Sequence, residues 1–481
     1  MNEVQTTAAS SSNCTPWRVV EFFAGMGGMR AAAAESGIPL RIVASYEISN
    51  VCAKAYWHNY GREGWQSKTI DSLPAADLDA LRADTWLMSP PCQPFTRCGR
   101  RLDQNDNRTL ALRHLIRVLP TMRCPPQRIL LENVIGFEAS ECRRQLLEGL
   151  AAMGWEAAEF GLDAVDFGLP NRRPRYYGLF RMPCSPDLSA EQFPKHPEAW
   201  PRPPVAEKAS PAAEGASPSL AQGTWCCCWQ SVGALLRANA ADDAPAAAVS
   251  SSSSSSSSSP ASSSPALPGD AVGDEGRELA ASVPDDGLLQ TWSGAGAPPP
   301  LGEFLQMPEE IAREESELGV SLEVPESIMS ERMAKDGRFD IHLRSDRTSA
   351  CLTKANGRLP RGFSPLVLID EAEAGTLEQL PKISAQGLGP GASTDHIWHP
   401  GVRVRYLSPT EQLRLMGYPA SYTFPGGLSF RDRCSLVGNS LNVRVVAWLL
   451  PLLITNNVNG QPDEEGSGAP EEVLPYTTSI T

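Results

Sequence analysis

A chain of 481 residues runs, near its start, through Arg18-Val19-Val20-Glu21-Phe22-Phe23-Ala24-Gly25-Met26-Gly27-Gly28-Met29. Its first half is apolar enough to form a buried strand, and a helix is expected from Met29 to Ser36. Glycines between a strand and a helix let the backbone approach a ligand closely, and the amino terminus of the helix favours a negative group. The stretch therefore predicts a ligand-binding turn, with a glycine turn that binds nothing as the alternative.

The alternation of strand and helix continues outward from this stretch. We predict strands at 41–46, 85–88 and 128–131, and helices at 50–59, 110–119 and 142–153. Such alternation favours an α/β fold with a mostly parallel, doubly wound sheet of the Rossmann-like kind. Ligands of these folds bind at the carboxyl ends of the strands.

The pattern stops after Arg181, and the rest of the chain divides by composition. A long segment is acidic and rich in Ala, Ser and Pro, with unbroken serine from Ser250 to Ser259. We expect a disordered insertion there, in which Pro308–Leu318 forms a short acidic helix. We divide the chain into a disordered leader, a main domain, the insertion, a smaller domain, a return to the main domain and a disordered tail: 1–15, 16–182, 183–327, 328–400, 401–456 and 457–481.

The net charge of −14 hides an uneven distribution of charge. Residues 183–330 hold 21 Asp and Glu against 6 Lys and Arg, and residues 1–15 and 461–481 carry another six acidic residues and no basic one. This leaves +7 for residues 16–182 and 331–460, most of the part expected to fold. A positive charge suits a nucleic-acid backbone, but this excess is too small to establish such a partner by itself.

The cysteines and the apolar stretches exclude other classes of protein. The twelve cysteines are irregularly spaced and form no paired Cys-x-x-Cys of the kind that binds structural zinc, so no metal is expected. The sequence shows no secretory signal, and free thiols indicate a reducing compartment, the cytoplasm or the nucleus. The longest apolar stretch, Val445–Ile454, contains a proline and is too short to span a bilayer, so no membrane partner is expected.

A candidate nucleophile follows the strand predicted at 85–88, in Ser89-Pro90-Pro91-Cys92-Gln93-Pro94-Phe95. Two prolines fix the chain as it leaves the strand and present the next side chain rigidly. Cys92 can act as a nucleophile if its thiolate is stabilised. The alternative is a buried, inert cysteine.

Charged residues stand at the ends of other predicted strands. Glu47 ends the strand after the glycine turn, where a carboxylate can hold ribose hydroxyls. Glu132, in Glu132-Asn133-Val134, faces the same crevice or else caps the next helix at the surface. Arg173 and Arg175 alternate as in a strand and point the same way, and paired guanidiniums suit phosphates and base carbonyls. Arg172 is better interpreted as solvated surface.

In this order, these four strings resemble the motifs of the cytosine-5 methyltransferase family: a glycine motif, a Pro-Cys motif, a Glu-Asn-Val motif and an Arg-x-Arg motif. Gly438-Asn439-Ser440-Leu441-Asn442-Val443 is similar to the late Gly-Asn-Ser motif of that family. Together the motifs cover residues 17–181 and about 400–455, and five in order are highly specific.

Within the family, the chain looks most like the branch that resembles DNA methyltransferases but modifies the anticodon loop of aspartate transfer RNA. The segment Pro90–Arg97, with Gly99-Arg100, matches the extended nucleophile loop of that branch, and the terminal Gly438–Val443 matches its late motif. Cys351-Leu352-Thr353-Lys354 is similar to its Cys-Phe-Thr signature, with Leu352 where the branch has Phe.

The resemblance implies a reaction and a set of site residues. S-adenosylmethionine would donate the methyl group, and the smaller domain would recognise the target. The thiolate of Cys92 would add to C6 of the cytosine, with Glu132 on N3 and the exocyclic amine and with Arg173 and Arg175 on the base carbonyl and the flanking phosphate. The implied cofactor-binding residues are Phe23, Ala24, Gly25, Met26, Gly27, Gly28, Glu47, Ile48, Asp71, Pro90, Asn439 and Ser440. The implied substrate-binding residues are Gln93, Arg97, Cys351, Thr353 and Lys354.

Three alternatives stay open at this stage. The nucleic acid is expected to be transfer RNA and the enzyme a monomer, but all five motifs fit a DNA methyltransferase equally well. A catalytically silent homologue that binds nucleic acid or a partner enzyme is a further reading, although Cys92, Glu132, Arg173 and Arg175 are all present. The serine-rich insertion is either a phosphorylated interaction segment or a passive expansion of low complexity.

Overall fold

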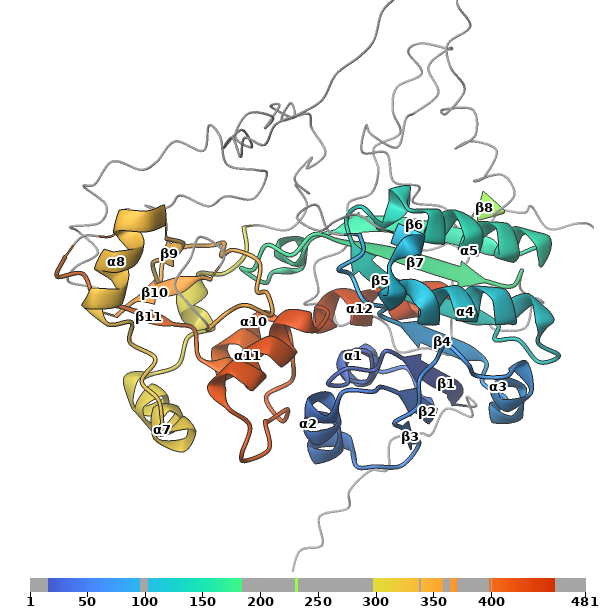
Figure 1. Cartoon of the computed structure of the whole chain (residues 1–481), viewed down its shortest axis with the longest axis horizontal. Coiled ribbons are helices and arrows are strands. Elements are labelled where there is room, and N and C mark those ends of the chain that lie inside the picture. Colours follow the sequence, from blue (N-terminus) through green and yellow to red (C-terminus); the bar gives the residue numbers. More distant parts are fainter. Residues whose placement is uncertain are drawn as a thin grey trace, which may run out of the picture.

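The computed structural model describes residues 16–95, 103–183, 230–231, 297–336, 339–357, 364–369, 398 and 400–454. The predicted leader and tail, most of the predicted insertion, and Arg97 lie outside the described residues. The described chain forms a large α/β unit and a smaller unit with its own sheet (Figure 1).

The large unit is built on a mixed sheet whose described strands lie in the order β3-β2-β1-β4-β5-β7-β6-β8. The strands are β1 (Trp17–Phe22), β2 (Leu40–Tyr46), β3 (Trp65–Gln66), β4 (Thr85–Met88), β5 (Arg128–Val134), β6 (Glu156–Leu162), β7 (Arg175–Arg181) and β8 (Gln230–Ser231). The five strands β3, β2, β1, β4 and β5 are parallel to one another, whereas β7 is antiparallel to both β5 and β6. The predicted fold, a mostly parallel α/β sheet with a smaller second unit, is confirmed.

Helices cover both faces of this sheet (Figure 1). The helices of the large unit are α1 (Gly28–Ser36), α2 (Asn50–Tyr60), α3 (Ala75–Leu81), α4 (Leu110–Val118), α5 (Glu141–Ala152), α10 (Pro409–Leu415), α11 (Phe430–Asn439) and α12 (Val443–Leu449). Short 3-10 turns include η1 (Asp103–Asn105), η2 (Asn107–Thr109) and η10 (Leu450–Leu453). Of these helices, α10 and α11 lie beside the sheet, towards the smaller unit (Figure 1). Alternate residues of the central strands face two apolar layers: Val19, Leu87 and Leu130 face that of α1 and α12, and Val20, Trp86 and Ile129 face that of α4 and α5. The period of two along each strand is what separates the two layers.

The end of the chain returns to the large unit. Helix α12 packs on α1, and η10 reaches β7. The helical run Phe430–Leu453 has the length and the mean hydropathy, 1.5, of a membrane span, but 72% of its most apolar window is buried inside the protein. This run is therefore core that closes one face of the sheet.

The smaller unit contains a second sheet in the order β11-β10-β9. Its elements are α8 (Glu326–Asp336), β9 (Ile341–His342), β10 (Leu366–Leu368) and β11 (Val404–Tyr406). Buried Met329, Phe339, Ile341, Leu366 and Val404 form a core of their own. Strand β11 lies in residues 401–456, which the sequence assigned to the main domain. It belongs instead to the smaller unit, because buried Val404 is part of this second core.

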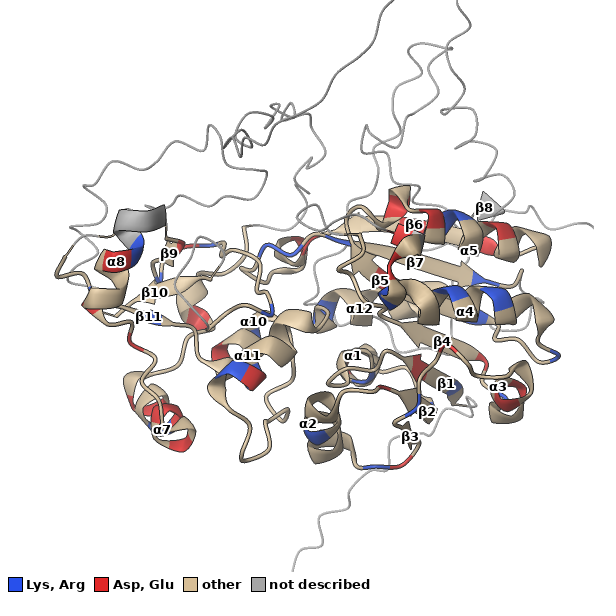
Figure 2. Cartoon of the chain, in the orientation of Figure 1, with Lys and Arg blue, Asp and Glu red and all other residues tan. Residues whose placement is uncertain are grey.

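Residues 297–327, which the sequence placed in the insertion, are folded in the structure. They form η8 (Leu301–Glu303) and α7 (Pro308–Leu318), whose surface is strongly acidic (Figure 2). Leu301, Leu305 and Leu322 are buried and anchor the segment. The helix predicted at Pro308–Leu318 is confirmed as α7. Composition concealed the fold around it, because a few buried apolar residues, among them these leucines, order a stretch that otherwise has the charge of a solvated one.

Candidate active site

The candidate site lies at the carboxyl ends of β1, β4 and β5, the three central parallel strands. Their register places Phe22 beside Met88 and Met88 beside Leu131. The residues that follow these strand ends are therefore neighbours at one edge of the sheet. This brings together the glycine turn, the Pro-Cys segment and Glu132.

Strand β7 adds Arg175 to the same edge. Because β7 is antiparallel to β5, its first residue, Arg175, pairs with Val134 near the end of β5. Directly paired residues of antiparallel strands share a face, and so do residues two apart on one strand. Arg175 and Glu132 consequently point the same way, and Arg175 Nε lies 3.4 Å from Glu132 Oε1.

Glu132 is buried and held on both sides. Ser89 Oγ donates a 2.7 Å hydrogen bond to Glu132 Oε2, and Arg175 forms an ion pair with the other oxygen. The neighbouring Asn133 donates through Nδ2 to the carbonyl oxygen of Pro90 at 3.3 Å, which ties β5 to the Pro-Cys segment. The reading of Glu132 as a surface helix cap does not fit this position.

Cys92 is half-buried beside these charges. Burial raises the pKa of the Cys92 thiol above its ordinary value, Arg175 and Arg173 lower that pKa, and Glu132 raises it, so the net shift is upward. In this state the sulfur carries its proton at neutral pH. Thiolate formation therefore depends on the cations near Cys92 and on what enters the site.

Arg108 supplies a further positive charge that the sequence analysis did not single out. Asp106 holds its guanidinium in a bidentate pair of 2.8 and 2.6 Å, and Arg108 interacts electrostatically with Cys92. Its side chain is 53% exposed. The sequence signal that could have pointed to Arg108 is its position two residues after Asp106, just before α4.

Arg173 lies deeper than the sequence suggested. Its Nη1 donates to the carbonyl oxygen of Leu352 at 2.7 Å, and its Nη2 donates to the carbonyl oxygens of Gly438, at 3.3 Å, and Ser440. Its main-chain N–H donates to Asp163 Oδ1 at 2.5 Å. Both Nη atoms thus donate to backbone carbonyls, and of the pair it is Arg175 that forms the ion pair with Glu132.

Cys351 lies against both arginines. Its sulfur is 3.5 Å from Arg173 Nη1 and 4.0 Å from Arg175 Nη2. Burial raises the pKa of Cys351, but the two arginines outweigh burial and hold the pKa below its ordinary value. The site therefore contains two thiols whose pKa values are shifted in opposite directions.

The other residues assigned to the substrate are spread around this cluster. Gln93 follows Cys92 and is half-buried, and Lys354 is exposed. Thr353 donates through Oγ1 to Asn356 Oδ1 at 3.2 Å, which shapes the loop after Cys351. Arg97 lies outside the described residues.

The glycine turn has the geometry of a cradle for a ligand. Phe23, Gly25 and Gly27 all have positive φ, of 59°, 54° and 91°. A Cβ at Gly25 would meet only Phe23 O, at 3.9 Å, so that side of the turn is open. Positive φ at a non-glycine residue is rare and marks a constrained turn, as is common at ligand sites.

Glu47 stands at the edge of this cradle. Its carboxylate accepts from the N–H groups of Gly25, at 3.0 Å, of Ile48, at 2.9 Å, and of Ser49, at 2.8 Å. Ile48 is 68% exposed, an apolar surface beside a fixed carboxylate. These residues match the chemical groups of S-adenosylmethionine. The carboxylate suits its ribose hydroxyls, the apolar surface suits its purine ring, and the open glycine turn leaves room for the rest of the molecule.

The remaining cofactor assignments occupy separate positions. Pro90 is buried next to the nucleophile, and Asp71 is exposed in the turn after Ile70. Ser440 Oγ is hydrogen-bonded to Tyr418 OH at 2.6 Å, and a Cβ at Gly28 would lie 3.0 Å from Ser440 Oγ, so the late motif adjoins the start of α1. Asn439 is the last residue of α11.

Comparisons with known proteins find relatives among cytosine-5 methyltransferases. Residues 17–204 match the family described as C-5 cytosine-specific DNA methylase. The mouse protein named tRNA (cytosine(38)-C(5))-methyltransferase is 29% identical over 91% of this chain and 93% of its own length. The DNA (cytosine-5)-methyltransferase of Dictyostelium discoideum is 28% identical over 92% and 95%. The crystal structure of a Spodoptera frugiperda DNMT2 mutant matches with a TM-score of 0.55 at 25% identity, over 91% of this chain and 100% of that one.

Proposed function

Because this chain belongs to the cytosine-5 methyltransferase family, we propose that its substrate is a cytosine of transfer RNA, in the anticodon loop of aspartate transfer RNA. The observation that carries the proposal is the meeting of Cys92, Glu132 and Arg175 at one strand edge, in a chain that aligns over 91% of its length with tRNA (cytosine(38)-C(5))-methyltransferases. The alignment includes the smaller unit as well as the main sheet, so it bears on target recognition and not only on the shared chemistry.

The geometry supports a covalent route. Cytosine C5 is too weak a nucleophile to take a methyl group, and addition of the Cys92 sulfur to C6 gives C5 the character of an enamine. Glu132, fixed by Ser89, hydrogen-bonds N3 and the exocyclic amine and so favours that addition. S-adenosylmethionine, when bound, supplies the electrophilic methyl group. Loss of the C5 proton and elimination of the Cys92 sulfur then release the product.

Arg175 has two electrostatic effects in the site. It neutralises Glu132 in the free enzyme, and it lowers the pKa of the Cys92 thiol against the effect of burial. Its remaining donors suit the base carbonyl oxygen. Arg173 keeps the surrounding segments in place and does not contact the base in this scheme, since both of its Nη atoms donate to backbone carbonyls.

An RNA loop suits such a site for an energetic reason. The target base must leave its stack to reach a half-buried sulfur, and unstacking costs least in a loop, where no Watson–Crick partner is lost. The positive charge of residues 16–182 and 331–460 is consistent with phosphate contacts around that loop.

Duplex DNA is the second candidate substrate. The observation in its favour is that a relative named DNA (cytosine-5)-methyltransferase aligns as fully as the transfer-RNA enzymes, at 28% identity over 92% of the chain. The catalytic cluster is the same for both substrates.

The test is transfer of a labelled methyl group from S-adenosylmethionine to three substrates: an aspartate transfer RNA, the same RNA with cytosine 38 replaced by uridine, and duplex DNA. We expect label on the first alone. Label on DNA and not on RNA would replace the proposal by its alternative. Absence of label from all three, with S-adenosylhomocysteine still bound, would identify a silent homologue. Cys92→Ala should bind S-adenosylhomocysteine and transfer nothing.

A further inference from the structure

The glycine turn of the cofactor site is contacted by a segment almost four hundred residues away in the chain. Tyr422 OH donates a buried 2.7 Å hydrogen bond to the carbonyl oxygen of Met26. Tyr60 OH, from the end of α2, donates to the next carbonyl, of Gly27, at 3.3 Å. Two successive carbonyls of the turn are therefore held by phenol groups from two different elements.

The phenol rings form a continuous group around the turn, which we name the tyrosine collar: Tyr56, Tyr60, Tyr418 and Tyr422. Neighbouring ring centroids lie 5.2 Å (Tyr56 and Tyr60), 6.1 Å (Tyr60 and Tyr422) and 4.6 Å (Tyr418 and Tyr422) apart. A Cβ at Gly27 would lie 2.4 Å from the ring of Tyr60, so the collar closes directly on the turn. The collar excludes any other residue at Gly27 and leaves the turn no room to move outward.

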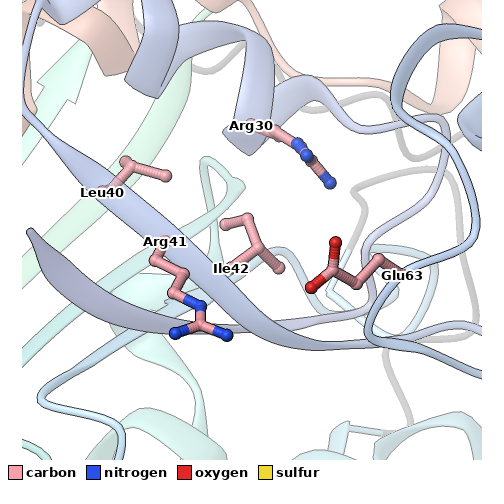
Figure 3. Close-up of a pocket in the computed structure, with 5 residues that line it drawn as sticks. All are labelled: Arg30, Leu40, Arg41, Ile42 and Glu63. Carbon is pink, nitrogen blue, oxygen red and sulfur yellow. The ribbon is translucent and has the colours of Figure 1, made fainter.

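On its outer side the collar is braced by Arg30. The guanidinium of Arg30 lies 4.8 Å from the ring centroid of Tyr60 and donates to Tyr56 OH at 3.2 Å. Figure 3 shows Arg30 on one side of a surface pocket, with Glu63 on the facing side. Buried Glu21 accepts from Tyr56 OH at 2.6 Å, so that ring is fixed from within as well.

The segment that carries Tyr422 is also fastened to α2 by hydrogen bonds of its own backbone. Asn59 donates through Nδ2 to the carbonyl oxygen of Thr423 at 2.9 Å and accepts from its N–H at 3.0 Å. Removal of the Tyr422 hydroxyl should therefore leave the segment in place. The hydrogen bond to Met26 can be tested apart from the docking.

The bond to Met26 fixes the orientation of a whole peptide plane. In the Met26–Gly27 peptide, the carbonyl oxygen accepts from Tyr422 OH, and the N–H donates to the carbonyl oxygen of Ala24 at 2.9 Å. A planar peptide with both ends fixed cannot rotate, and the positive φ of Gly27 that opens α1 follows from that plane. The amides that face a ligand at the start of α1 are thereby oriented before any ligand arrives.

We propose that Tyr422 is a positioning residue for the cofactor: its hydroxyl holds the glycine turn in the shape that binds S-adenosylmethionine. The inference concerns the cofactor alone and holds whichever cytosine the enzyme methylates. Tyr60 has a smaller part, because its bond is longer and the Gly27 oxygen also accepts from Ala31 N–H within α1.

The experiment is calorimetric titration of the full chain with S-adenosylhomocysteine, in the absence of nucleic acid. Tyr422→Phe should bind it about three- to tenfold more weakly, the effect of losing one buried hydrogen bond to a carbonyl. Tyr60→Phe should weaken binding by less. Where turnover is measured, the KM for S-adenosylmethionine should rise by the same factor in Tyr422→Phe while kcat stays within about twofold.

Tyr406→Phe is the matched control, since it removes a phenol from β11 in the smaller unit and should leave S-adenosylhomocysteine binding unchanged. Thermal unfolding of each unliganded variant shows whether a loss of binding comes from misfolding. If Tyr422→Phe is misfolded, the smaller loss of binding expected for Tyr60→Phe tests the hold on the turn instead. Unchanged affinity in a folded Tyr422→Phe, an equal loss in Tyr406→Phe, or a fall in kcat at constant KM would each overturn the proposal.

Discussion

Arg173 Nη1 donates a 2.7 Å hydrogen bond to the carbonyl oxygen of Leu352, across 179 positions of the sequence. The same guanidinium reaches the carbonyls of Gly438 and Ser440, so one side chain joins the segment before β7 to the loop of Cys351 and to the late motif. A buried cation with fixed donors is well suited to this task, because one guanidinium can serve several carbonyls at once.

We expect Arg173→Met to lower the free energy of unfolding by about 2–4 kcal/mol, since it leaves three carbonyls without their donor. Urea unfolding measures the change. Arg172→Met is the control from the same segment: its partly exposed side chain forms one 3.3 Å pair with Asp163, and its loss should cost less than about 1 kcal/mol. Equal unfolding midpoints for the two variants would contradict the assigned role of Arg173.

The two thiols of the site should react with alkylating agents at different pH. The pKa of Cys351 is lowered by Arg173 and Arg175, which outweigh its burial, whereas burial raises the pKa of Cys92. Since only the thiolate reacts, Cys351 should be alkylated by iodoacetamide at a lower pH than Cys92.

Peptide mass spectrometry after short exposures across a pH series resolves the two sites. Arg175→Met removes a cation from both and should move both alkylation profiles to higher pH, whereas Glu132→Gln removes a negative charge and should move that of Cys92 to lower pH. Alkylation of Cys92 before Cys351 in the unaltered protein would show that the order of the two pKa values is reversed.

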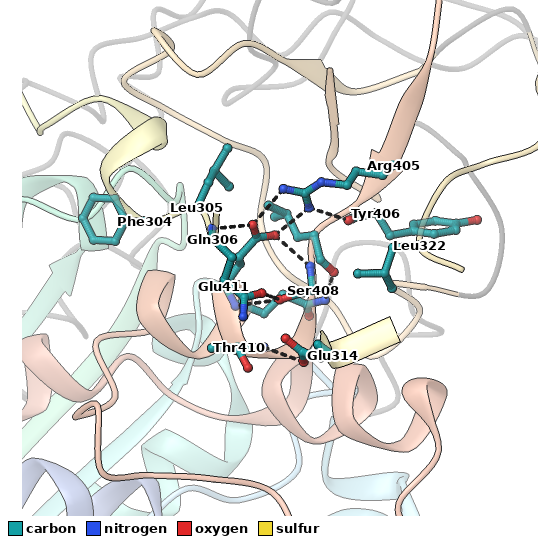
Figure 4. A network of polar contacts seen from close by, with 12 residues as sticks. Phe304, Leu305, Gln306, Glu314, Leu322, Arg405, Tyr406, Ser408, Thr410 and Glu411 are labelled. Carbon is teal, nitrogen blue, oxygen red and sulfur yellow. Dashed lines mark hydrogen bonds and ion pairs between the residues drawn. The ribbon is translucent and has the colours of Figure 1, made fainter. Parts of the chain in front are cut away.

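Glu411 should be among the most costly single residues to alter. Its fully buried carboxylate accepts from Arg405 Nη1 and Nη2, both at 2.8 Å, and from the N–H groups of Gln306 and Ser408, also at 2.8 Å (Figure 4). Glu411→Gln leaves Arg405 buried without its anion, which costs about 3–5 kcal/mol of unfolding free energy.

The control for Glu411 is the exposed pair of Glu323 and Arg403, whose atoms lie equally close, at 2.7 Å. Glu323→Gln should change the unfolding free energy by less than about 1 kcal/mol, because solvent screens that pair. In a double-mutant cycle, Arg405→Met with Glu411→Gln should cost clearly less than the sum of the single changes. Additive costs would mean that the two residues act separately.

His342 makes the stability of the smaller unit dependent on pH. Burial lowers the pKa of this histidine, but Asp340 at 2.9 Å and Asp346 at 3.4 Å outweigh burial and raise the pKa from 6.5 to about 10. A raised pKa stabilises the folded protein fully below the unfolded value and progressively less above it. The unfolding free energy should therefore fall between about pH 6.5 and pH 10.

Urea unfolding at several pH values in that window measures the slope. His342→Gln should flatten it, while His58→Gln, which alters an exposed histidine, should leave it unchanged. A slope that survives in His342→Gln would assign the pH dependence to other groups.

The fold could be predicted well because its signals are local. The strand before Gly25, the glycine turn and the helix after it are specified by residues next to one another, and the predicted strand at 85–88 coincides with β4. The placing of Cys92 and Glu132 at one edge also follows from sequence, because parallel strands bring their carboxyl ends together.

The parts that sequence did not reveal depend on distant partners. The strand alternation of Arg173 and Arg175 predicts a shared direction, but Arg173 is taken up by carbonyls 179 to 267 positions away, which no local pattern encodes. The partner of Tyr422 is 396 positions away. The acidic composition of residues 297–327 concealed their order, except for the helix predicted and found at Pro308–Leu318.

The packing of α12 on α1 sets an order of events during synthesis. The ribosome releases the amino-terminal strands first, but the layer that covers their α1 face is completed by residues 443–453, more than four hundred positions after β1. Apolar surface on the nascent protein stays uncovered until residues 443–453 have emerged, a state that invites aggregation or chaperone binding. A message truncated just before residue 443 would encode Cys92, Glu132 and Arg175 and yet yield no closed domain in which they could meet.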